Sequence, residues 1–127
     1  MRPANGAVTI AVVDDDGAVQ NSICRLVQSV GYQCEVYGSA EAFLDALALI
    51  QPASAIIDFI LPGLNGLELQ RLLNERGAKM PIIMVSADGG RVRERALEQG
   101  AVAVLEKPFE AEALLAAIRF ALQLSGS

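Results

Sequence analysis

Short apolar runs alternate along this chain with segments whose apolar residues recur every three or four positions. A run that is apolar throughout is typical of a strand buried on both faces of a parallel sheet. We therefore predict strands over residues 8–13, 54–58, 81–86 and 102–106. A fifth strand over residues 33–37 (QCEVY) is more polar, which suits a position at the edge of the sheet.

The segments between these strands have the spacing of amphipathic helices. Helices are predicted over residues 18–30, 40–49, 66–76, 91–99 and 110–124, the fourth one after a break at Gly89-Gly90. Asp16, Ser39 and Asn65 stand where they can cap the first three. Strict alternation of strands and helices predicts an α/β fold, a flavodoxin-like doubly wound (βα)5 sandwich with parallel sheet order 2-1-3-4-5.

The composition limits which classes of protein this chain can belong to. The chain has 127 residues, 53% of them hydrophobic and 20% charged, which predicts a single globular domain over 1–127 with a core from about 8 to 124. A net charge of −5 argues against binding of nucleic acid by this segment. No leader pattern or membrane-length apolar run is visible, so we expect a cytoplasmic protein without membrane contact.

Two cysteines, Cys24 and Cys34, lie inside predicted elements and lack the spacing of metal ligands. We expect both to be buried free thiols, in keeping with a reducing compartment.

Polar residues follow the apolar strands at the point where each strand ends. In parallel sheets these ends share one edge, and ligands bind there at the point where the strand order reverses, here between the first and third strands. Each of these polar residues alone could simply mark the point where the chain returns to solvent, but their convergence at one edge predicts a binding site. These residues are Asp14, Asp15, Asp58, Ser86 and Lys107.

Three neighbouring carboxylates repel one another unless a cation intervenes, and Mg2+ prefers such oxygen ligands. A lysine and a serine beside them would provide a charge and a hydrogen bond to a phosphoryl group. The chain contains no histidine, so catalytic triads that use histidine are excluded. Asp58 is the candidate nucleophile for an acyl phosphate.

Four motifs, VVDDD, DFILPGLNG, VSAD and LEKPF, resemble the receiver domain of two-component response regulators, the last being similar to FixJ-type regulators. The resemblance implies a switch rather than a turnover enzyme, phosphorylated by a cognate sensor histidine kinase to control transcription through an output domain. It also implies a cis Lys107-Pro108 peptide bond. The implied residue roles are Asp58 as phosphoacceptor, Ser86 and Lys107 as phosphoryl ligands, and Asp15, Asp58, the Ile60 carbonyl and, through water, Asp14 as the Mg2+ site.

Two positions depart from the family pattern. Val104 stands where many members have an aromatic residue that moves on activation, so the output is expected to rely on the loop after the fourth strand. Ile60 is apolar where many members are polar, and we expect it to hinder the hydrolytic water. In many members of the family, the surface formed by the elements predicted at 91–99, 102–106 and 110–124 pairs two copies on phosphorylation. Arg91, Arg93 and Arg95 could there meet Glu110 and Glu112 in a homodimer, or these charges could simply form a solvated face.

Two other interpretations stay open. A phosphatase of the haloacid dehalogenase class uses similar groups, but it normally has a second acid at the position of Ile60. The second alternative is an interaction module of the receiver type that acts alone or independently of phosphorylation. Val104, in place of an aromatic residue, favours this alternative.

Overall fold

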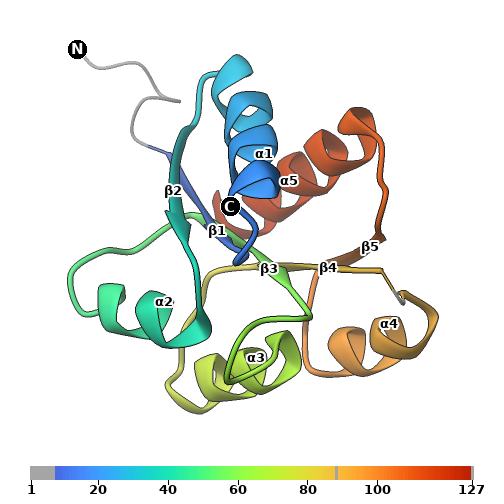
Figure 1. The fold of residues 1–127 in the computed structure, drawn as a ribbon. Helices are drawn as coiled ribbons and strands as arrows, with labels where there is room; N and C mark the ends of the chain where they lie inside the picture. Colours follow the sequence, from blue (N-terminus) through green and yellow to red (C-terminus); the bar gives the residue numbers. More distant parts are fainter. Residues whose placement is uncertain (1–7, 88, 127) are drawn as a thin grey trace.

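A five-stranded parallel sheet in the order β2-β1-β3-β4-β5 forms the centre of the computed structural model, which describes residues 8–87 and 89–126 (Figure 1). The predicted α/β fold class and strand order are confirmed, and the polar second strand lies at an edge. The strands are β1 (Thr9–Val13), β2 (Gln33–Tyr37), β3 (Ser54–Asp58), β4 (Ile82–Ser86) and β5 (Ala103–Glu106).

The central strands are buried because helices cover both faces of the sheet. Every residue of β3 and β4 is buried, which explains why neither strand alternates apolar with polar residues. In the register, Val13 pairs with Ile57, and Asp58 pairs with Val85. The residues that follow β1 and β3 therefore leave the sheet side by side.

Five helices connect the strands: α1 (Gly17–Ser29), α2 (Ala40–Ala46), α3 (Gly66–Glu75), α4 (Gly89–Glu98) and α5 (Ala111–Gly126). All three predicted N-caps are confirmed. The Asp16 carboxylate accepts hydrogen bonds from two amides of α1, and the Ser39 hydroxyl accepts one from Ala42. Asn65 forms a capping box with Glu68 at the start of α3.

The helices divide the core into two parts. Residues of α2, α3 and α4 pack on one face of the sheet around Phe43, Leu69 and Leu73. Residues of α1 and α5 pack on the other face around Val27, Leu114 and Ile118. Figure 1 shows these two layers on either side of the strands. No helix in the described ranges is both long and apolar enough to cross a membrane.

Three predicted details of the helices are wrong. Helix α2 ends at Ala46 rather than Leu49, and the next residues form turns instead. Gly89 and Gly90 lie within α4 rather than before it, because the packing of buried Val92 offsets the low helix propensity of glycine. Helix α1 ends at Ser29 rather than Val30, because Val30 is its C-cap, with a φ of −107° outside the helical range.

The prediction of two buried free thiols is also wrong. Cys24 of α1 and Cys34 of β2 form a disulfide bond, with their Cα atoms 5.5 Å apart, and both residues are only half-buried. The reason is the packing of α1 against the strand that follows it, which places the two positions face to face. The bond fastens α1 to the edge of the sheet.

Candidate functional site

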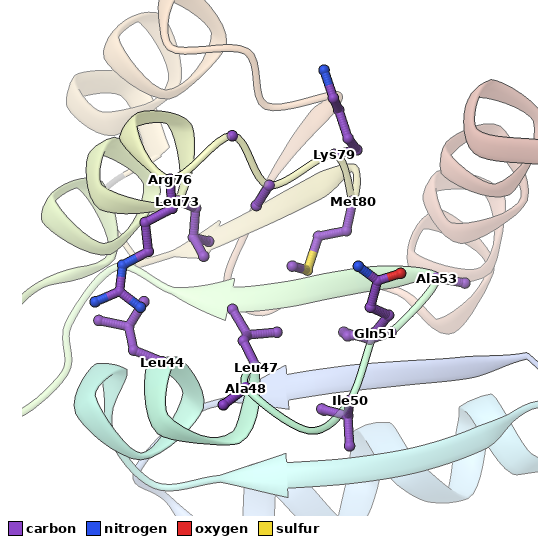
Figure 2. A pocket seen from close by; sticks show the side chains of 13 residues that line it. Leu44, Leu47, Ala48, Ile50, Gln51, Ala53, Leu73, Arg76, Lys79 and Met80 are labelled. Atoms are coloured by element: carbon purple, nitrogen blue, oxygen red, sulfur yellow. The ribbon is translucent and has the colours of Figure 1, made fainter.

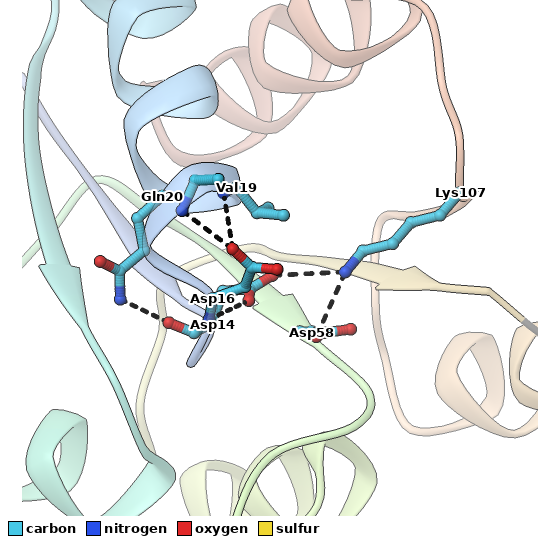
Figure 3. A network of polar contacts seen from close by, with 7 residues as sticks. Asp14, Asp16, Val19, Gln20, Asp58 and Lys107 are labelled. Atoms are coloured by element: carbon cyan, nitrogen blue, oxygen red, sulfur yellow. Dashed lines mark hydrogen bonds and ion pairs between the residues drawn. The ribbon is translucent and has the colours of Figure 1, made fainter.

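The predicted site residues converge at the edge of the sheet where the strands end. Asp14 follows β1, Asp58 ends β3, and Lys107 follows β5. Figure 3 shows the lysine reaching across the edge so that its ammonium group lies between the two carboxylates. Residues from three separate segments of the chain thus form one cluster.

Lys107 links the two buried carboxylates directly. Its Nζ atom lies 3.4 Å from Oδ2 of Asp14 and 3.3 Å from Oδ2 of Asp58. Asp14 is 3% exposed and Asp58 is 8% exposed. Because buried carboxylates are costly without a partner, this shared cation is a major source of compensation for both.

Two neighbours in the chain hold Asp14 in place. The backbone N–H of Asp16 donates to Oδ1 of Asp14 at 2.9 Å, and the side-chain amide of Gln20 donates to the Asp14 carbonyl oxygen (Figure 3). Asp16 in turn caps α1, so the start of this helix fixes the acidic loop. The contact of Gln20 was not predictable from the sequence, because its position in the helical pattern is that of an ordinary polar surface residue.

The electrostatic state of Asp58 reflects competing effects. Burial raises the pKa of Asp58, and the negative charge of Asp14 raises it further. Lys107 and a hydrogen bond with the backbone of Ile60 act in the opposite direction without cancelling the increase. Burial would lower the pKa of Lys107, but the charges of Asp58 and Asp14 outweigh this, so that its pKa is raised. The lysine therefore stays charged at neutral pH.

The carboxylates are arranged in a way that fits a divalent cation. Asp14, Asp15 and Asp58 each offer one oxygen atom, and these atoms all lie within 4.8 Å of one another. Asp15 is exposed, whereas the other two are buried. A few carboxylate oxygens beside open solvent suit Mg2+, which keeps several of its own waters.

The other predicted positions lie around this cluster. Ser86 is buried at the end of β4, and its carbonyl oxygen accepts a hydrogen bond from the backbone N–H of Lys107. The peptide bond between Lys107 and Pro108 is cis. The side chain of Ile60 is 65% exposed. Val104 is buried, and its carbonyl oxygen accepts a hydrogen bond from Arg93 of α4 at 2.9 Å.

Comparison with known families assigns the chain to one class of protein. The family model of the response regulator receiver domain matches residues 10–119. The chain therefore belongs to this family, and it is a receiver domain of a response regulator in two-component signalling. Receiver domains are signalling switches rather than classical turnover enzymes, and they partner with sensor kinases.

Individual relatives support this assignment. The chain is 39% identical over 117 residues to the response regulator protein TmoT of Ectopseudomonas mendocina, covering 91% of this chain and 53% of the relative. It is 38% identical over 117 residues to the transcriptional regulatory protein FixJ of Azorhizobium caulinodans, covering 91% and 56%. The chain thus spans about half the length of these curated relatives.

Solved structures agree with the sequence comparisons. The crystal structure of FixJ-N matches with a TM-score of 0.85 and 28% identity, over 93% of this chain and 95% of that one. Full-length FixJ from B. japonicum matches with a TM-score of 0.87 and 33% identity, over 94% and 59%. The predicted resemblance to response regulators of the FixJ type is confirmed.

Proposed function

We propose that this chain is a phosphoacceptor receiver in which Asp58 takes a phosphoryl group from the phosphohistidine of a cognate kinase. A carboxylate oxygen of Asp58 forms the new bond to phosphorus while the bond to the histidine nitrogen breaks. The observation that carries the proposal is the Lys107 ammonium held 3.3 Å from Asp58 and 3.4 Å from Asp14. This contact favours the ionised, nucleophilic form of the Asp58 carboxylate, against the burial that raises its pKa.

The other groups of the site would then act on the incoming phosphate. Lys107 would neutralise its charge, and the hydroxyl of Ser86 would donate a hydrogen bond to one of its oxygens. Mg2+ would be held by Asp15, Asp58 and the carbonyl oxygen of Ile60, with Asp14 acting through water. When bound, this ion supplies positive charge that offsets the negative charge of the transferring phosphoryl group.

Incubation with acetyl phosphate and Mg2+, followed by mass spectrometry, tests the proposal. We expect one added phosphoryl group on the wild-type chain, stable in acid and labile in base, and none on Asp58→Asn. Asp45→Asn is the matched control, because Asp45 is an exposed aspartate on α2 outside the cluster. An adduct that persists in Asp58→Asn would contradict the assignment. Continuous hydrolysis of acetyl phosphate over many turnovers would instead support a phosphatase.

A phosphorylation-independent interaction module is the second candidate, and Val104 is the residue that favours it. Val104 is buried and cannot exchange rotamers as an aromatic side chain would. Under the main proposal, the signal would leave through the segment between β4 and α4, with the Arg93 contact to Val104 linking α4 to β5. A chain that forms no adduct with acetyl phosphate but binds its partner normally would favour the second candidate.

Several wider features belong to the same proposal. Residues 1–127 would be the receiver part of a longer cytoplasmic regulator whose output domain controls transcription, without direct contact of this segment with nucleic acid.

Exposed Arg91 and Arg95 of α4 and Glu112 of α5 would join two copies through the surface formed by α4, β5 and α5. Sedimentation with and without a beryllium fluoride complex measures this, and a monomer in both conditions would argue against the dimer.

A further inference from the structure

A cavity of about 690 Å3 lies at the end of the sheet opposite the carboxylate cluster. Its walls come from α2, α3 and the loops that lead into β3 and β4, as Figure 2 shows. The strands begin at this end, whereas Asp58 stands where β3 finishes. No residue of the carboxylate cluster contributes to the lining, so the two sites are separate.

The interior of this cavity is aliphatic. Leu73 of α3 is buried, and Leu44, Leu47 and Met80 are partly buried against the same half of the core. In Figure 2, Leu73 and Met80 face Leu47 across the space. No aromatic side chain belongs to the lining. Leu49, in the loop that forms one wall, is 90% exposed, so further aliphatic surface is available in this loop.

The cavity has positive charge and no negative charge in its lining. Arg76 and Lys79 are its charged residues, although the chain as a whole has a net charge of −5. Neither forms an ion pair with any residue of the described ranges. In Figure 2 the Arg76 guanidinium extends over the space toward Leu44, while Lys79 points away from it. A cation at the C-terminal end of α3 also suits the helix dipole, but that role requires no aliphatic cavity beside it.

We propose that this cavity binds a small aliphatic monocarboxylate, with its hydrocarbon part between α2 and α3 and its carboxylate on Arg76. The volume lies within the usual range of ligand pockets, about 300–1,000 Å3. Arginine pairs with a carboxylate through two parallel hydrogen bonds, which selects this head group over an alcohol or an amine. The exposed amide of Gln51 on the opposite wall adds a second polar group.

Amide NMR spectra of the whole chain, titrated with octanoate and separately with octan-1-ol, test the proposal. Octanoate is expected to give saturable shifts concentrated in residues 44–53 and 73–80. Arg76→Gln, at an exposed position, should weaken octanoate binding about tenfold, as expected for the loss of a charge-assisted hydrogen bond. It should leave the weaker binding of octan-1-ol unchanged.

Two further variants make the result specific. Ala48→Trp places a large ring at an exposed position in the lining and should abolish the binding of both probes while the spectrum stays folded. Arg71→Gln removes a cation five residues earlier, which pairs with Glu75 and does not line the cavity, so this variant should bind octanoate normally. The absence of saturable shifts, or equal weakening by Arg71→Gln and Arg76→Gln, would overturn the proposal. So would unchanged binding to Ala48→Trp.

Discussion

Loss of the bond between Cys24 and Cys34 should lower the free energy of unfolding by about 2.7 kcal/mol. The two residues are ten positions apart, and closing a loop of this length removes about 9 cal/mol/K of entropy from the unfolded chain. At 25 °C this corresponds to the stated free energy. For a chain of 127 residues, the melting temperature should fall by roughly 10 °C.

Urea denaturation of four samples measures this effect. The wild-type chain and the double variant Cys24→Ser, Cys34→Ser are each unfolded with and without dithiothreitol. The reductant should move the wild-type transition to lower urea, close to that of the double variant, and should leave the double variant unchanged. A thiol titration in parallel should find two free thiols only after reduction.

Two results would refute this reasoning. If the oxidised wild-type chain already has two reactive thiols, the bond does not form in solution. If the bond forms but its reduction leaves the urea midpoint unchanged, the entropy gained in the unfolded state is cancelled by strain in the folded one. The second result would show that α1 and β2 contribute nothing to stability through this bond.

Three further predictions concern the site. Gly66→Ala should destabilise the domain by about 2–3 kcal/mol in urea denaturation, because a Cβ atom there would lie 2.6 Å from the Asp58 carbonyl and 2.9 Å from the Met84 sulfur; an unchanged midpoint would contradict this packing. The fold raises the pKa of Asp58 above 3.8. As the pH rises from that value through the raised pKa, ionisation of Asp58 therefore lowers the free energy of unfolding of the wild-type chain. Asp58→Asn removes this cost, so its stability relative to wild type, measured in EDTA, should increase across that window and then level off; a constant difference would argue against the raised pKa. Ile60→Asn should shorten the lifetime of the proposed phosphoryl group, as measured by autodephosphorylation, and an equal or longer lifetime would reject a shielding role for the exposed isoleucine.

The architecture was predictable because its strands carry strong local signals. The apolar runs that end at Asp14 and Asp58 indicate strands buried on both faces, and a parallel sheet then has few possible orders. The convergence of Asp14, Asp58 and Lys107 follows from the same topology. Their separations could not be predicted, since these depend on how a long lysine side chain crosses the sheet edge between two carboxylates.

The missed features depend on packing between segments. The pairing of Cys24 with Cys34 requires knowledge of which side of α1 faces β2, and periodicity does not specify this. The cavity beside Arg76 lies where α2 ends at Ala46 and the next residues form turns, whereas the sequence pattern continues to Leu49. The sequence therefore identifies apolar positions well but does not show where packing leaves a gap.

One cation is shared between two acids in the carboxylate site, and this arrangement leaves the site with excess negative charge. A separate partner for each of Asp14 and Asp58 would neutralise both and leave no reason to bind another positive charge. With Lys107 shared between them and Asp15 exposed beside them, the cluster contains three carboxylates and one ammonium group. The raised pKa of Asp58 shows that this compensation is incomplete. The remaining repulsion favours the uptake of a cation at the same place where the proposed phosphoryl group would arrive.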